Sequence, residues 1–229
     1  SKKYLNAQLS KYDVQLIETL VRTSQAKQRL RRDIFHVTEV FTENFINREQ
    51  HTIDDLYNEL KYTSYEPLLS KHLDNLKKGV YQEFETELDL YLLKRTLSAA
   101  KTQEARSYTK FLIDRHNISL ALKGIKPSIP GGRIPLGAYE NATQAKDVAN
   151  VCKKHNIDTD ADTPESIEKA LQTRLRKMGH KMLSKNPLSE ASIIGYLILK
   201  TTDIRALNIL LKMKHDGFDE EAIREVIVA

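Results

Sequence analysis

Seven histidines and several adjacent carboxylates are the side chains of this sequence best suited to acid–base or metal chemistry. The histidines are His36, His51, His72, His116, His155, His180 and His215. They form no HExxH motif and no pair spaced four residues apart, the spacing with which a helix offers two ligands to zinc. Asp54-Asp55 and Glu220-Glu221 stand at expected helix starts, where the helix dipole stabilises acids without catalysis. The sequence therefore predicts no catalytic residue, no metal and no cofactor.

Gly131-Gly132-Arg133 is the segment that comes closest to a phosphate-binding loop. No strand is expected before it and no Gly-Lys-Ser/Thr follows it, so the parts of a Walker-type loop are missing. The single cysteine, Cys152, excludes an internal disulfide and a cysteine-rich zinc site, and is typical of a reducing compartment. An enzyme is the least supported class of protein.

The positive charge of the chain is concentrated near its start. The formal net charge is +5, and residues 1–32 contain eight Lys or Arg against two acids, which leaves the remainder close to neutral. Such a segment is either a solvated helix face or a surface for nucleic-acid phosphates, here through Lys27, Arg29, Arg31 and Arg32. The longest apolar run, residues 193–199, is far shorter than the about 20 residues of a membrane-spanning helix. No membrane span is expected.

Apolar spacing and capping residues predict helices along most of the chain and an all-α fold, with Thr52 and Ser189 as N-caps and Gly217 as a C-terminal stop. The expected helices cover residues 4–32, 52–60, 68–78, 81–101, 103–123, 143–155, 163–185, 189–215 and 220–228. Residues 33–46 fit a helix less well, and a short extended piece is the alternative there. Residues 124–137 are rich in Gly and Pro, so we place a domain boundary in this linker.

One pattern recurs three times. Asp13, Asp114 and Asp203 each precede an apolar position by four residues, two more apolar positions follow at seven and eight residues, and a basic residue comes next. The aspartate is expected to begin or re-start a helical stretch, and the apolar positions are expected to face a core. Chance similarity between amphipathic helices is the alternative. The copies are too far apart for a solenoid of helix pairs and favour separate small helical domains.

The third copy lies within a longer pattern made of Tyr196-Leu197, Lys200, Asp203-Ile204-Arg205, Leu207, Leu210-Leu211, Lys214, Gly217 and Glu220 to Ile223. This pattern resembles the C-terminal signature of the C subunits of archaeal and bacterial A/V-type ATPases, the relatives of the eukaryotic d subunits. Asp203 replaces the usual Glu of that family and Ala206 the usual Asn. Further matches are the internal copy at Asp114, Asn117 and Lys123, and a recurring element at Leu60, Thr63 and Tyr65.

The resemblance covers essentially the whole chain and implies tandem helical domains that form a funnel with pseudo-threefold symmetry in the full protein. Residues 1–32 would be the end of the first domain, 33–124 the second and 125–229 the third, with most of the first domain missing. The family member is a non-catalytic component of the central stalk. It is a socket between the central shaft and the membrane proteolipid ring, and it transmits torque for ATP-coupled ion transport.

The implied partners are central-shaft subunits of the D and F type and the proteolipid ring, with the membrane stator as a further candidate. The implied location is the cytoplasmic face of the cell membrane, peripheral to it. Neither nucleic acid nor a small-molecule substrate is implied.

Basic residues at the repeat ends and in the linker are the expected contacts with shaft or ring: Lys123, Lys126, Arg133, Lys212 and Lys214. The repeats would place them at equivalent corners of the funnel. Asp13, Asp114 and Asp203 are expected to be structural, as caps or packed polar groups. Two other classes remain: a basic helical nucleic-acid-binding protein, and an adaptor whose loop at Gly217-Phe218 resembles ubiquitin-associated domains.

Overall fold

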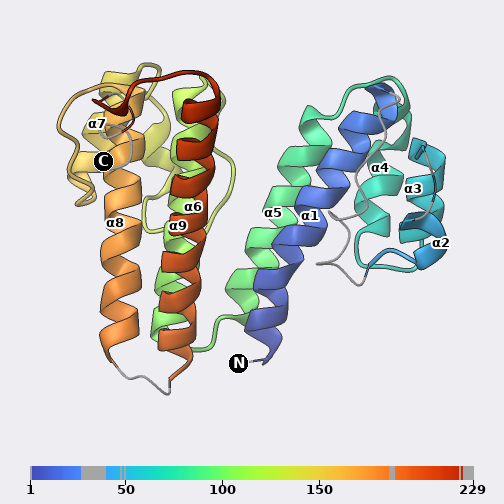
Figure 1. Ribbon diagram of the computed structural model, residues 1–229, viewed down its shortest axis with the longest axis horizontal. Helices are drawn as coiled ribbons and strands as arrows, with labels where there is room; N and C mark the ends of the chain where they lie inside the picture. The colour runs from blue at the N-terminus through green and yellow to red at the C-terminus, as the bar shows by residue number, and fades with distance from the viewer. Residues whose placement is uncertain are drawn as a thin grey trace. The chain divides into compact units, whose positions relative to one another are not determined.

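The computed structural model describes residues 2–26, 40–46, 48, 50–185, 189–221 and 223. Over these residues the chain folds into α-helices joined by turns and loops, without a strand (Figure 1), so the predicted all-α class is confirmed. No described helix combines the length and the apolar character needed to cross a membrane. The basic side chains proposed for nucleic acid, Lys27, Arg29, Arg31 and Arg32, lie outside the described residues, as does the first half of the predicted element at 33–46.

The chain forms two compact units, residues 1–99 (unit 1) and 100–229 (unit 2). The junction therefore falls between Ala99 and Ala100, and the Gly/Pro-rich linker at 124–137 lies inside unit 2. The division into repeat domains with boundaries at 32 and 124 stays a prediction.

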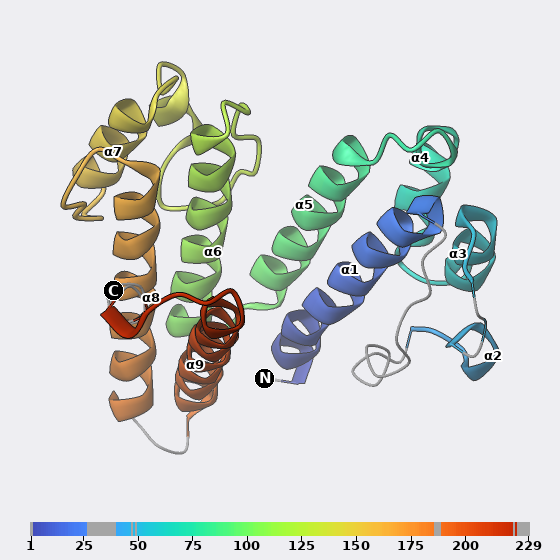
Figure 2. The ribbon, with the colours of Figure 1, turned by 45° about the horizontal axis from the view of Figure 1, so that its top comes forward.

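Unit 1 is built from five helices in its described part: α1 (Lys2–Ala26), α2 (Glu43–Ile46), α3 (Ile53–Leu60), α4 (Glu66–Lys77) and α5 (Gln82–Ala99). The long helices α1 and α5 pack side by side, and α3 and α4 pack on each other and against this pair (Figures 1 and 2). Leu20, Leu60, Leu69 and Leu88 are among the buried side chains that fill the core between them. The predicted cap is confirmed: the Thr52 side chain accepts from the Asp55 N–H, and Asp55 accepts from the Thr52 N–H.

Glu18 of α1 is a half-buried acid that faces other acids. Burial, and then the negative charges of Asp89 and Glu85 on α5, raise the pKa of its carboxyl from 4.5 to about 7, against the opposing charge of Arg22. Below pH 4 the carboxyl is protonated in both the folded and the unfolded chain. Between pH 4 and pH 7 the unfolded chain loses this proton before the folded chain does. Above pH 7 the charged Glu18 therefore lowers the free energy of unfolding.

We expect Glu18→Gln to stabilise the chain at pH 8 by roughly 1 kcal/mol, after allowance for solvent screening of a half-buried group. Urea unfolding at pH 8 and at pH 4 checks this, because the gain should vanish at pH 4. An equal gain at both pH values would mean that the charge of Glu18 is not its cause.

Unit 2 contains α6 (Gln103–Leu122), the short 3-10 helix η2 (Leu136–Tyr139), α7 (Ala145–Lys154), α8 (Pro164–Lys185) and α9 (Glu190–His215). Helices α8 and α9 run antiparallel and pack closely where two glycines meet (Figure 1). A Cβ atom at Gly195 would lie 2.6 Å from the Gly179 carbonyl oxygen, so only glycine permits this approach of the two backbones. The predicted cap by Ser189 is confirmed, since its side chain accepts from the Ser192 N–H.

The linker of unit 2 is tied to α6 by two buried polar side chains. Asn117 donates from Nδ2 to the Ile129 carbonyl oxygen over 2.8 Å, and its Oδ1 accepts from the Ile129 N–H over 3.2 Å. Asp114 Oδ1 accepts from the Ile134 N–H over 3.0 Å. A Cβ atom at Gly132 would lie 2.1 Å from Asp114 Oδ1, so the linker backbone needs glycine to reach the carboxylate. We call Asp114 and Asn117 the clasp.

Candidate interaction surface on α9

The three repeat aspartates occupy different environments. Asp13 of α1 accepts a hydrogen bond from the Tyr65 hydroxyl over 3.2 Å, and Asp114 belongs to the buried clasp. Asp203 of α9 is exposed and lies 3.9 Å from Arg176. All three lie in the middle of continuous helices, so the prediction that each begins or re-starts a helical stretch is wrong. Burial raises the pKa of Asp114, and hydrogen bonds from the linker backbone oppose the shift.

The apolar positions that follow each aspartate are mostly buried in the first two copies and mostly exposed in the third. Ile17 in α1 and Ile118 in α6 each have 0% of their surface exposed, whereas Leu207 in α9 is 57% exposed and Leu211 63%. The prediction that these positions face a core is therefore wrong for the third copy. The reason is that the buried residues of α9 all lie between Ala191 and Ile198.

Beyond Ile198, α9 leaves the helices that cover its first turns. Figure 1 shows α6, α8 and α9 from the side, whereas Figure 2 shows α9 close to end-on and α6 and α8 still from the side, so α9 diverges from these two helices. In this outer part the half-buried Ala206 and Leu210 lie about 100° around the helix from the exposed Leu207 and Leu211. The helix thus offers a second apolar face to its surroundings.

Five of the exposed apolar side chains of α9 form one line along it. We call Ile193, Leu197, Ile204, Leu207 and Leu211 the α9 stripe; each is at least 41% exposed, and the exposed Tyr196 and Ile209 lie off this line. Together with Lys200 between Leu197 and Ile204, the members follow one another at alternating intervals of four and three residues. Alternation of this kind keeps side chains on one narrow face of a helix and is typical of a seam that packs against a second helix.

The five predicted basic contacts are exposed but do not form one cluster. Lys212 and Lys214 lie in the last turn of α9, next to the outer end of the α9 stripe. Lys123 is the C-cap residue of α6, and Lys126 follows it in the linker. Figure 2 shows the ends of α6 and α9 apart, so these four lysines form two separate pairs. Arg133 instead lines a pocket beside α8.

Charged side chains also border the inner side of α9. Arg205 is partly enclosed, and burial together with the nearby charge of Arg115 lowers the pKa of its guanidinium, while Glu168 opposes the shift. Arg115 forms an ion pair with Glu168 of α8, which links α6 to α8 at this level. The first half of α9 is held by apolar packing and glycine contacts, and no residue of α9 beyond Ile198 is fully buried.

The four-and-three spacing of the α9 stripe is visible in the sequence. The same spacing is also typical of a helix face that is buried in a core. Helix α9 carries apolar residues on two faces, with Ile194 and Ile198 inward and Ile193 and Leu197 outward. The periodicity of these apolar residues does not show which of the two faces is covered by other helices. The sequence therefore predicts basic side chains as contacts and does not single out the exposed apolar side chains of α9.

Comparison with known proteins places the chain in a family. The family model described as ATP synthase (C/AC39) subunit matches residues 1–226. The A-type ATP synthase C subunit of Pyrococcus abyssi is 27% identical over 78% of this chain and 55% of its own length. For the C subunit of Pyrococcus horikoshii the identity is 24% over 96% of this chain and 66% of the relative. The C subunit of Methanobrevibacter smithii is 26% identical over 77% and 54%, respectively.

The chain spans between about half and two thirds of the length of these curated relatives. No solved structure matches it. The match of the family model runs through both compact units and includes α9 with its signature residues. The resemblance noted in the sequence is therefore confirmed, and the chain belongs to the ATP synthase (C/AC39) subunit family.

Proposed function

We propose that this chain acts as a non-catalytic coupling component of a rotary A-type ATP synthase. It links the central shaft to the membrane proteolipid ring and passes torque between them. Family membership supports the assignment to such a complex, because the similar proteins are named as C subunits of A-type ATP synthases. In this proposal the chain lies at the cytoplasmic surface of the membrane, and ATP is made or hydrolysed by other subunits.

The observation that carries the proposal is the exposed α9 stripe. A line of five large apolar side chains on one helix face is costly to leave in water, since each buried side chain of this size contributes about 1.5–3 kcal/mol. Single exposed apolar residues are ordinary, but a contiguous row is typical of a protein–protein contact. The α9 stripe lies within the C-terminal signature of the family, which is the part of the chain expected to serve the shared function of the family.

The occupant that we assign to the α9 stripe is a helix of the central shaft. The alternation of four and three residues suits a partner helix that inserts its own apolar side chains between those of the stripe. Lys200 and Lys214 continue the same alternation, and Lys212 adds a charge nearby. A matching partner would therefore carry acids beside its apolar row, which would also speed and orient its approach.

The proposal is tested by affinity purification with this chain from solubilised membranes of its source, with bound proteins identified by mass spectrometry. Recovery of both the central-shaft subunits and the proteolipid ring is expected. Recovery of neither, also with a chain as long as the curated relatives, would contradict it. Nucleic acid that is recovered instead and washes off with salt would favour the alternative of a basic nucleic-acid-binding protein.

A further inference from the structure

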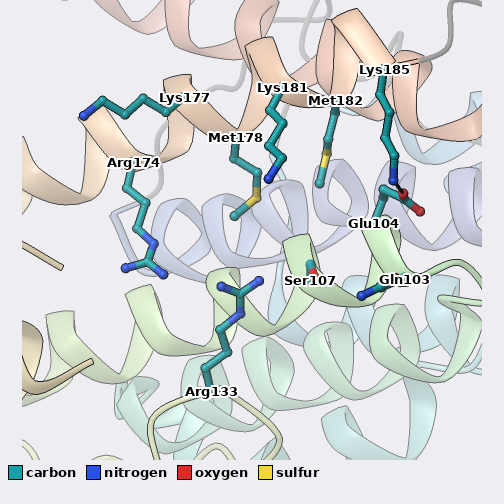
Figure 3. Close-up of a pocket in the computed structure, with 10 residues that line it drawn as sticks. All are labelled: Gln103, Glu104, Ser107, Arg133, Arg174, Lys177, Met178, Lys181, Met182 and Lys185. Atoms are coloured by element: carbon teal, nitrogen blue, oxygen red, sulfur yellow. Dashed lines mark hydrogen bonds and ion pairs between the residues drawn. The ribbon is translucent and has the colours of Figure 1, made fainter. Parts of the chain in front are cut away.

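A basic pocket of about 370 Å³ lies in unit 2 between α8, the start of α6 and the linker. Its walls are formed by Gln103, Glu104, Ser107, Arg133, Arg174, Lys177, Met178, Lys181, Met182 and Lys185 (Figure 3). Five of these ten side chains are cations and one is an acid. The acid, Glu104, forms an ion pair with Lys185 over 2.6 Å, at one end of the pocket. The remaining cations thus face a space whose lining contains no second carboxylate.

The cations reach this space from different elements. Figure 3 shows Arg133 rising from the linker and Arg174 descending from α8, so that their guanidinium groups face each other, and Lys181 descends beside them. Lys177 extends away along α8. Convergence of Arg133, Arg174 and Lys181 on one space distinguishes this pocket from a solvated lysine-rich helix face.

The two arginines are held close despite their like charges. Arg174 Nη1 donates to the His155 carbonyl oxygen over 3.3 Å and to the Asn156 carbonyl oxygen, which holds this nitrogen of the guanidinium group against the end of α7. Burial, and then the charge of Arg133, lower the pKa of the Arg174 guanidinium, while Asp114 and Asp158 oppose the shift. The carboxylate of Asp114 is already engaged by the Ile134 N–H of the linker. An anion between the guanidinium groups would relieve their repulsion.

The rest of the lining suits more than a bare anion. Met178 and Met182 form an apolar wall on α8, and methionine adapts its shape to flat or irregular groups. Gln103 and Ser107 on α6 add neutral groups that can donate and accept hydrogen bonds. A cavity of this size lies within the range of small-molecule sites, which combine apolar walls with a few placed polar groups.

We propose that this pocket binds the polyphosphate group of a soluble small molecule of the nucleotide class. Arg133 and Arg174 would hold phosphate oxygens with paired N–H groups, and Lys181 would add a third charge. The methionines and the α6 side chains would contact the remainder of the ligand. The site is a binding site without catalysis, and it is independent of the coupling role proposed for α9.

Binding is tested with the whole chain by isothermal titration calorimetry with ATP and with inorganic pyrophosphate, at low and at moderate salt. We expect saturable binding of both, tighter for ATP, and weaker as salt increases. Each of Arg133→Glu and Lys181→Glu should weaken binding at least about tenfold, as the loss of one charge-assisted contact predicts. Lys169→Glu is the matched control, because Lys169 is an exposed lysine of α8 that does not line the pocket.

Arg174 is left unchanged in this test, because its hydrogen bond to the His155 carbonyl contributes to the fold. Circular dichroism of each variant verifies that the helices are retained. The proposal is overturned if neither ligand binds, or if Lys169→Glu weakens binding as much as the pocket variants do. Binding to anionic lipid vesicles without saturable binding of pyrophosphate would overturn it as well, because the ligand would then be a membrane surface.

Discussion

Gly195→Ala is expected to destabilise unit 2 by about 3 kcal/mol, although alanine is the better helix former by nearly 1 kcal/mol. The added Cβ atom would lie 2.6 Å from the Gly179 carbonyl oxygen and 2.7 Å from the Leu183 backbone nitrogen. Both are backbone atoms of α8, which cannot rotate aside as a side chain can. The two helices would have to separate, and the packing of the whole α8–α9 pair would loosen. Urea unfolding followed by circular dichroism measures the loss.

Gly137→Ala provides the matched control in the same unit. A Cβ atom at Gly137 meets only the Glu140 side chain, at 3.8 Å, which is an ordinary contact. This variant is expected to stay within about 0.5 kcal/mol of the parent chain. Equal unfolding midpoints for Gly195→Ala and Gly137→Ala would show that the close helix contact does not exist as described.

Asn117→Ala is expected to lower the free energy of unfolding by about 3 kcal/mol, because it removes half of the clasp. The buried N–H and carbonyl groups of Ile129 both lose their partner, and each buried group left unpaired costs about 1–3 kcal/mol. The loss should appear in urea unfolding. It should also appear as faster hydrogen exchange at the Ile129 amide, while amides in the middle of α6 remain protected.

Asn150→Ala is the matched control. It tests whether the loss of stability depends on the position of the asparagine rather than on the residue type. Asn150 is an exposed residue of α7, so its replacement should change the stability by no more than about 0.5 kcal/mol. If Asn117→Ala were as mild as this control, the linker would not depend on the clasp.

Local features of this fold could be predicted because the interactions that create them are local. Thr52 and Ser189 each cap the helix that follows, as their positions before an apolar periodic segment indicated. Gly217 has a φ of 80° directly after the end of α9, in agreement with the expected glycine stop. The same reasoning placed the helix ends near 79 and 123. In each case a few neighbouring residues contain the whole interaction.

The clasp and the α9 stripe depend on contacts that spacing along the chain does not record. Asn117 of α6 forms hydrogen bonds with the backbone of Ile129 in the linker. The motif that contains Asn117 is visible in the sequence, but this contact is not. The three repeat copies look alike in sequence, yet Ile118 is covered by the rest of its unit and Leu207 is not. Which helix face is covered depends on the tertiary arrangement, and an apolar residue fits a core and an interface equally well.

The basic pocket illustrates the same point for charge. Arg133 was one of the predicted contacts, and the glycines before it were considered for phosphate binding and rejected for lack of a Walker-type loop. In the structure Arg133 faces Arg174, which lies 41 positions further along the chain. A set of cations gathered from separate elements leaves no motif in the sequence.

The proposed coupling role rests on the α9 stripe, and its most direct test is the affinity of the chain for isolated central-shaft subunits. The double variant Leu207→Asp/Leu211→Asp places two charges on the stripe without touching a buried residue, so the fold should be retained. Tyr62→Asp is the matched control, because Tyr62 is an apolar side chain that is 92% exposed in unit 1.

We expect the double variant to weaken binding at least about 100-fold, which corresponds to the loss of two central apolar contacts, and Tyr62→Asp to leave it unchanged. Binding of the double variant as tight as that of the parent chain would contradict the account. A second result would also contradict it: the parent chain forms dimers, the double variant does not, and both bind the shaft with the same affinity. In that case the occupant of the stripe would be a second copy of this chain rather than the shaft.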